Sequence, residues 1–169
     1  MNRSKLSVEK MTILIDTREQ APFAFRGERY KDVSTEVAGL TVGDYSLKGL
    51  EDKVSVERKS LPDLVSCLGR ERDRFMRELQ RAAALSAFCV VVEGSFEQLA
   101  KGEYRSNINA HAASQSIAAF MARLGIPFFF AGSRAAAEYM TWSFLKQYIQ
   151  GVFRRYECIL KAHGRGVEQ

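Results

Sequence analysis

The chain has 169 residues, of which 46% are hydrophobic and 27% charged, so it can build one compact core and lacks the composition of a disordered region. The net charge of +5 is a moderate hint of an acidic partner such as nucleic acid. Three unclustered cysteines argue against a disulfide framework or a zinc site. No apolar run suits a membrane span or a secretion signal, so we expect a cytoplasmic or nucleoid-associated protein that is neither secreted nor membrane-bound.

The first half of the chain is predicted to consist mainly of strands. The run MTILID at 11–16 is apolar and β-branched, which predicts a buried strand that delivers Asp16 to the edge of a sheet. Short strands joined through Gly39 and Gly43 follow, and the run KVSVERK at 53–59 predicts another strand.

The second half alternates between helical and strand patterns. Pro62, with Ser60 as N-cap, starts a helix, and a second helix is expected over 70–86 with an apolar face that includes Phe75 and Leu79. Further elements are predicted in the order of a buried strand over 87–93, a helix over 107–124 with Ile117, Phe120, Met121 and Leu124 inward, a strand over 125–132 and a helix over 135–161. This order favours an α/β sandwich with a central mixed sheet flanked by helices. We expect three segments: a flexible N-terminus at 1–10, a single domain at 11–162 and a basic tail at 163–169.

One hairpin in this pattern places acidic side chains together. If the segments 44–48 and 53–59 pair antiparallel across the loop GLED, Asp44 lies opposite Glu57, and both share a polar face with Lys59. Clustered carboxylates need either a shared proton or a bound cation. Their oxygen atoms, with Asp16 as a further candidate ligand, suit Mg²⁺ or Mn²⁺. A divalent ion beside the Lys59 ammonium suits hydrolysis of a phosphodiester, with the lysine orienting or deprotonating the attacking water.

Each of these residues also has an ordinary structural interpretation. A Glu-x-Lys triplet on a strand is usually a solvated face, and Asp44 after Gly43 fits a turn. Asp63 near a helix start fits a charge that complements the helix dipole. Asp16 and Arg18 fit an exposed ion pair at the end of a strand.

The spacing of the motif resembles that of the XPF family of structure-specific endonucleases, a branch of the PD-(D/E)XK restriction-enzyme-like superfamily. The shared pattern is Gly-Asp, a gap, Glu-Arg-Lys, three residues and Asp, here GDY…VERKSLPD, and the resemblance covers about residues 11–150. It implies a restriction-endonuclease-like fold and metal-dependent cleavage of DNA that leaves a 5′-phosphate and a 3′-hydroxyl. The tandem helix-hairpin-helix modules of larger relatives are not found before Gln169, so we expect a stand-alone form from a bacterial or phage setting.

The resemblance also implies roles for single residues. It makes Asp44 and Glu57 metal ligands, Lys59 the catalytic lysine, Asp16 an auxiliary acid, and Arg58 and Asp63 motif residues with supporting roles. Because Arg58 points away from Glu57 in a regular strand, we expect it to buttress the site by pairing with an acid such as Asp63.

Basic residues supply candidate DNA contacts. Four arginines recur along one helical face, at Arg70, Arg74, Arg77 and Arg81. They either track phosphates or form a surface stripe partly neutralised by Asp73 and Glu78, and the sequence leaves both interpretations open. Arg18 and Arg105 are further candidates. Family members commonly pair through this domain, so a homodimer is a candidate assembly.

Three functions from different classes remain open. The first is a metal-dependent DNA endonuclease acting on branched, flapped or nicked DNA in repair or recombination, which the complete set of acids and lysine favours. The second is a catalytically silent DNA-binding scaffold of the same fold. The third is a basic α/β protein without a nucleic acid partner, in which the motif is a coincidence.

Overall fold

The computed structural model describes residues 8–164, and a mixed six-stranded sheet forms its centre. The strands are β1 (Met11–Asp16), β2 (Val33–Ala38), β3 (Tyr45–Leu47), β4 (Val54–Lys59), β5 (Ala87–Val92) and β6 (Phe128–Phe130). Their spatial order is β2-β1-β3-β4-β5-β6, and β3 runs antiparallel to both of its neighbours while the other pairs are parallel. The strands β1, β4 and β5 therefore run in one direction, and their C-terminal ends meet at the same edge of the sheet.

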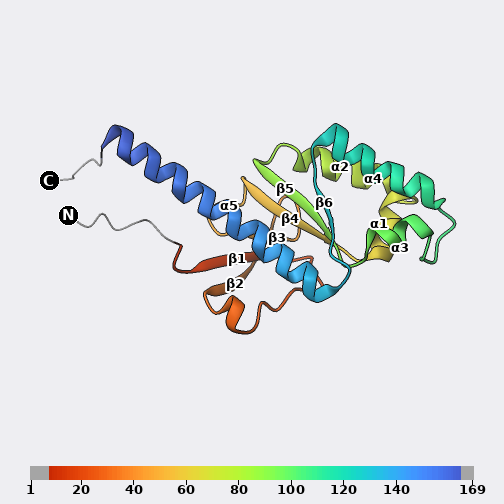
Figure 1. The fold of residues 1–169 in the computed structure, drawn as a ribbon, viewed down its shortest axis with the longest axis horizontal. Helices are drawn as coiled ribbons and strands as arrows, with labels where there is room; N and C mark the ends of the chain where they lie inside the picture. Colours follow the sequence, from red (N-terminus) through yellow and green to blue (C-terminus); the bar gives the residue numbers. More distant parts are fainter. Residues whose placement is uncertain (1–7, 165–169) are drawn as a thin grey trace.

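Helices cover both faces of this sheet and make it the middle layer of three (Figure 1). They are α1 (Leu61–Leu68), α2 (Arg72–Ala82), α3 (Phe96–Lys101), α4 (Ala110–Leu124) and α5 (Arg134–His163), with a short 3₁₀ turn, η1 (Glu28–Tyr30). The first four lie on one side, and α5 packs against the other side and continues past the sheet (Figure 1). The predicted α/β sandwich with a mixed sheet is confirmed. Within residues 8–164, no helix is both long and apolar enough to span a membrane.

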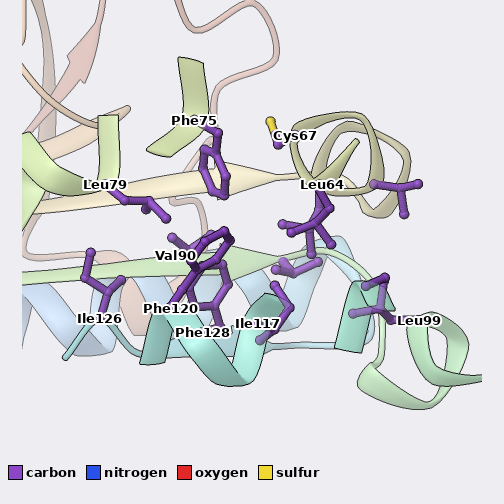
Figure 2. Packing of buried hydrophobic residues seen from close by; sticks show 14 of the residues in the cluster. Leu64, Cys67, Phe75, Leu79, Val90, Leu99, Ile117, Phe120, Ile126 and Phe128 are labelled. Carbon is purple, nitrogen blue, oxygen red and sulfur yellow. The ribbon is translucent and has the colours of Figure 1, made fainter. Parts of the chain in front are cut away.

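Strand β5 joins the two hydrophobic cores. Its residues Phe88, Val90 and Val92 pack with residues of α1, α2 and α4. Figure 2 shows Val90 among the buried side chains of this cluster. The alternate residues Cys89 and Val91 pack in the core under α5. Because both faces of β5 are buried, its sequence is a continuous apolar run without alternation.

Some predicted boundaries and faces differ from the structure. The helix expected over 70–86 is shorter, because Gly69 leaves helical geometry at the end of α1 and the next helix begins only at Arg72. The helix expected over 107–124 begins at Ala110, where the side chain of Asn109 caps it. Met121, predicted to face inward, is 45% exposed. Helix α3 was not predicted, although its Ser-x-x-Gln capping box is a sequence signal for a helix start.

The ends of the chain fall largely outside the described residues. Residues 8–10 have no regular secondary structure, and the helix α5 ends at His163. Residues 1–7 of the flexible N-terminus expected at 1–10, and residues 165–169 of the basic tail expected at 163–169, lie outside the described range.

Candidate active site

The register of the β3–β4 hairpin is the one predicted. Tyr45 lies opposite Val56 and Ser46 opposite Ser55, and the Asp44 amide donates to the Val56 carbonyl at 2.9 Å. The same register sets Asp44 level with Glu57. The face that carries Tyr45 and Val56 packs in the core under α5, as expected.

The polar face of the hairpin is buried as well. Ser46 and Ser55 are 0% exposed, and each hydroxyl is satisfied by backbone. Ser46 donates to the Val54 carbonyl at 2.6 Å, and Ser55 lies 2.7 Å from the Val42 carbonyl oxygen, to which it donates. Because both hydroxyls are hydrogen-bonded, burying them costs little free energy.

Gly43 sets the position of the following acid. Its φ of +77° is a conformation that favours glycine, and an added Cβ would lie 2.1 Å from the Ser55 hydroxyl oxygen and 3.0 Å from the Val56 carbonyl oxygen. The chain therefore needs glycine here to turn tightly against β4 and present Asp44 at the strand edge.

Asp44 and Glu57 form a pair of poorly solvated carboxylates. Glu57 is 4% exposed, and Asp44 is half-buried with its Oδ2 accepting the Arg58 amide at 2.8 Å. Burial raises the pKa of Asp44 to about 6. Burial, and then the charge of Asp44, raise the pKa of Glu57 well above its usual range. Both shifts come mainly from removing the carboxylates from water, and the shift of Glu57 also comes from the charge of Asp44.

Lys59 supplies the nearest positive charge. Its ammonium forms an ion pair with Glu57 and lies 5.8 Å from the centre of the Phe75 ring. Burial alone would lower the pKa of Lys59, but the ion pair and hydrogen bond with Glu57 outweigh burial and hold that pKa above its usual value. Lys59 is therefore an ammonium that can donate hydrogen bonds.

Arg58 anchors the back of the site, but its partners differ from the one expected. Its guanidinium bonds both oxygens of Glu19 at 2.9 Å and Oε1 of Glu93 at 3.0 Å. Arg134 at the start of α5 bonds the same Glu93 oxygen at 2.8 Å. The expected pairing of Arg58 with Asp63 is wrong, because the side chain of Asp63 accepts from the Ser60 hydroxyl at the N-terminus of α1.

Sequence reasoning missed Glu19, Glu93 and Arg134. A signal for Glu93 was available, because it directly follows a buried parallel strand whose end meets the ends of β1 and β4. Glu19 was also within reach, in the charged cluster that follows the first strand. Arg134 is 41 residues away from Glu93 in the chain, and only the tertiary fold brings the two together, so no local sequence pattern indicated Arg134.

Asp16 does not join the other acids as a third ligand. It is 2% exposed, its Oδ1 bonds the Arg18 guanidinium at 2.6 Å, and its Oδ2 accepts the Leu40 amide at 2.6 Å. Burial opposes ionisation, but these hydrogen bonds outweigh it and lower the pKa of Asp16. The alternative of an ion pair with Arg18 at the strand end is the one observed, although only the arginine is exposed. The Asp16 amide donates to the Asp44 carbonyl at 2.8 Å, so this residue holds the acidic strand end in place.

These elements enclose an open cavity of about 540 Å³. The acids and bases that line it are Arg18, Glu19, Asp44, Arg58, Lys59, Asp63, Arg70, Glu71 and Arg74. Arg70 lies in the turn before α2, and Arg74 pairs with Glu71 rather than with the expected acids. Arg77 and Arg81 are exposed further along α2, away from the lining of this cavity, and Arg105 lies between α3 and α4.

The pair Asp44 and Glu57 fits a small hard cation. Among residues 8–164, no group of three or more His, Cys, Asp or Glu side chains is arranged to hold a metal ion. Mg²⁺, however, commonly binds through one or two carboxylates and keeps several water molecules. Two desolvated carboxylates with raised pKa values meet this need, and an added cation would remove their mutual repulsion.

Comparisons with known proteins identify a domain family and structures of similar fold. The ERCC4 domain matches residues 15–142, which is most of the chain. The structure of XPF from Aeropyrum pernix is similar with a TM-score of 0.65 and 20% identity, over 81% of this chain and 61% of that chain. A second structure, of XPF from Aeropyrum pernix in complex with DNA, has a TM-score of 0.65 and 20% identity over 84% of this chain and 66% of that one. The chain thus spans less than two thirds of these structures.

No curated protein matches the chain. The match to the ERCC4 domain covers both the Gly-Asp turn and the Glu-Arg-Lys strand, and the solved structures share the fold. The chain therefore belongs to the ERCC4 domain family.

Proposed function

We propose that this protein is a metal-dependent DNA endonuclease that hydrolyses phosphodiester bonds in branched, flapped or nicked DNA during repair or recombination. The observation that carries the proposal is the meeting of Asp44, Glu57 and Lys59 at one sheet edge, beside a cavity rimmed by arginines. Membership of the ERCC4 domain family supports it. A similar solved structure is XPF in complex with DNA, which supports DNA as the substrate.

Asp44 and Glu57 are the residues that would hold Mg²⁺ or Mn²⁺. When bound, such an ion lowers the pKa of a water ligand and offsets negative charge on the phosphate. Asp16 contributes by holding the Asp44 backbone through its amide rather than by adding an oxygen ligand. Arg58 contributes in the same way, because its amide donates to Asp44 while its side chain is held between Glu19 and Glu93.

Lys59 acts as a hydrogen-bond donor and a positive charge. The ion pair with Glu57 holds the pKa of Lys59 above its usual value. Lys59 therefore remains protonated at neutral pH and is a poor base. Its ammonium can orient an attacking water and stabilise charge that develops on the phosphate oxygens. The ammonium also lies over the Phe75 ring, 5.8 Å from its centre, where the ring face attracts a positive charge.

Arginines beside the acids are suited to the DNA backbone. Arg18, Arg70 and Arg74 line the cavity, and their guanidinium groups are largely exposed, with 71%, 84% and 71% of each side chain accessible. Arg77 and Arg81 continue this basic line along α2. Exposed guanidinium groups in a row can contact successive phosphates without reading the bases.

A cleavage assay tests the proposal. The chain, Asp44→Asn and Lys59→Ala are compared on flap, fork, nicked and duplex DNA with Mg²⁺, Mn²⁺ or EDTA. We expect cleavage only with a divalent ion, and its loss in both variants. Asp52→Asn is the matched control, because it removes one carboxylate from the exposed loop of the same hairpin.

The same assay separates the nuclease from a silent scaffold. We expect Asp44→Asn to bind DNA as tightly as the unsubstituted chain or more tightly, because it removes a negative charge near the phosphate. DNA binding without cleavage in any metal would support the scaffold instead. Absence of both would leave the motif without a role in DNA chemistry.

We also propose that two copies pair through α5. Apolar residues recur along its C-terminal half at an alternating spacing of four and three. Leu145 and Ile149 pack in the core of the chain, and Val152, Tyr156 and Ile159 continue the same spacing beyond them. Tyr156 and Ile159 are 54% and 50% exposed. The C-terminal part of α5 continues past the sheet (Figure 1). Light scattering after size exclusion is expected to give a dimer for the chain and a monomer for Ile159→Lys. A monomer for both would contradict the pairing.

A further inference from the structure

A second cavity of about 290 Å³ lies beside the candidate active site. It is bounded by one side of α1, by the turn that follows this helix and by the segment between α3 and α4. The polar side chains in its wall are Ser66, Arg70, Tyr104, Arg105 and Ser106.

The two cavities share one wall. Pro62, Ser66 and Arg70 line both of them. Pro62 and Ser66 are four residues apart and lie on one face of α1. Arg70 follows just after the helix ends, and its guanidinium donates to the Ser66 hydroxyl oxygen at 3.4 Å. These three residues form a ridge, with the acidic residues on one side and the second cavity on the other.

The chemistry of the second cavity differs from that of the first. None of its lining residues, all within the described part of the chain, carries a carboxylate. Arg105 forms no ion pair with any residue from 8 to 164, and the nearest carboxylate oxygen to Arg70 is that of Glu71 at 3.9 Å. Two weakly paired guanidinium groups beside hydroxyl groups are suited to an anion that accepts several hydrogen bonds.

The walls of this cavity are held by contacts within the protein. The Tyr104 hydroxyl donates to the Ile108 carbonyl at 3.2 Å, and the Ser106 hydroxyl oxygen accepts the Ile108 amide at 3.3 Å. Ile108 packs against the core cluster that contains α1. The arginine-bearing segment is thus tied to the protein core, and its backbone is prearranged relative to the ridge.

We propose that this cavity binds a backbone phosphate of the DNA strand, next to the phosphate that is cut. The proposal rests on the proposed function, because it takes the other side of the ridge as the place of cleavage. A strand that crosses the ridge with one phosphate beside Lys59 places a neighbouring phosphate between Arg70 and Arg105. This subsite positions the strand through its backbone and is independent of base sequence.

Binding across a range of salt concentrations tests the subsite. Asp44→Asn serves as the parent, so that DNA remains intact, and Arg105→Ala is added to it. We expect about a tenfold loss of affinity at low salt, as for one charge-assisted contact, and a log-log salt slope that is smaller by about 0.9 on duplex DNA. Arg123→Ala, an exposed arginine near the end of α4, is the control and should change neither value. Arg105→Lys should retain the slope.

Single methylphosphonate replacements then locate the contact. One neutral linkage near the incision should lower the DNA affinity of the parent and of the Arg123→Ala chain. The same linkage should not lower the affinity of the Arg105→Ala chain any further. Equal losses in all three chains at every position would overturn the subsite. So would the absence of DNA binding by the parent.

The outcomes distinguish this proposal from the nuclease itself. Normal metal-dependent cleavage with an Arg105→Ala slope equal to that of Arg123→Ala would reject the subsite and leave the nuclease standing. If the unsubstituted chain cuts no DNA in any metal, but one neutral linkage still weakens binding only when Arg105 is present, the phosphate subsite stands and the nuclease is rejected.

Discussion

Replacing Asp44 by Asn should stabilise the metal-free protein and remove its response to divalent ions. The asparagine side chain has the same shape, and its carbonyl oxygen can still accept the Arg58 amide that Asp44 accepts at 2.8 Å. The change therefore removes charge with little loss of packing. It also removes the repulsion that contributes to the raised pKa of Glu57.

The size of the effect follows from the pKa of Asp44. Burial raises it from 3.8 to about 6, which corresponds to about 3 kcal/mol of folding free energy. Since the folded state holds this proton more tightly than the unfolded chain, the metal-free protein loses that stability as the pH rises from below 4 to above 6. At pH 8 the loss is complete, and Asp44→Asn avoids it.

Thermal unfolding at pH 8 measures the effect directly. In EDTA, we expect Asp44→Asn to melt above the unsubstituted chain, by about 2–4 °C for each kcal/mol. Mg²⁺ or Mn²⁺ should raise the melting temperature of the unsubstituted chain, since only its folded state holds the ion, and should have much less effect on the variant. Asp52→Asn, which removes an exposed charge from the same hairpin, should behave like the unsubstituted chain in both buffers.

Two results together would refute this reasoning. They are equal melting temperatures for the unsubstituted chain and Asp44→Asn in EDTA, and equal shifts of both on adding metal. The carboxylates would then be neither strained by repulsion nor responsible for holding an ion.

Three other substitutions test the frame that holds the site. Arg58→Ala should cost about 3 kcal/mol in urea denaturation, because it leaves the buried Glu19 without its ion-pair partner and Glu93 with Arg134 alone, and a loss below 1 kcal/mol would contradict the anchoring role. Gly43→Ala should lower both the melting temperature and metal binding, because its Cβ would lie 2.1 Å from a buried hydroxyl oxygen; unchanged binding would show that the turn does not position Asp44. Phe75→Ala should cost about 3–5 kcal/mol in the same denaturation experiment, because the ring is 1% exposed, and a well-tolerated change would mean that this core collapses around the gap.

The hairpin shows what sequence patterns could predict. Its register followed from two-residue alternation, since a single pairing puts Tyr45, Leu47, Val54 and Val56 on one apolar face. That pairing also brought Asp44 level with Glu57 before any tertiary contact was considered. The motif spacing indicated the family for the same reason, because its residues lie on one hairpin and the helix that follows it.

The partners of Arg58 show what sequence patterns could not predict. Glu19 and Glu93 lie 39 and 35 residues away from it, and Asp63 was the nearer acid in the chain. Only the strand order and directions bring the ends of β1, β4 and β5 to one edge. The same fold commits both oxygens of Asp16 to Arg18 and Leu40, and so removes it from the expected ligand set.

The sequence by itself thus determined the acidic pair, the lysine beside it and the family, because alternation along a strand and the geometry of a tight turn act over a few residues. The tertiary structure alone decided which charges neutralise one another and where Arg70 and Arg105 line a second cavity. Electrostatic contacts depend on distance in space, and here that distance is set by an antiparallel strand inserted between two parallel ones.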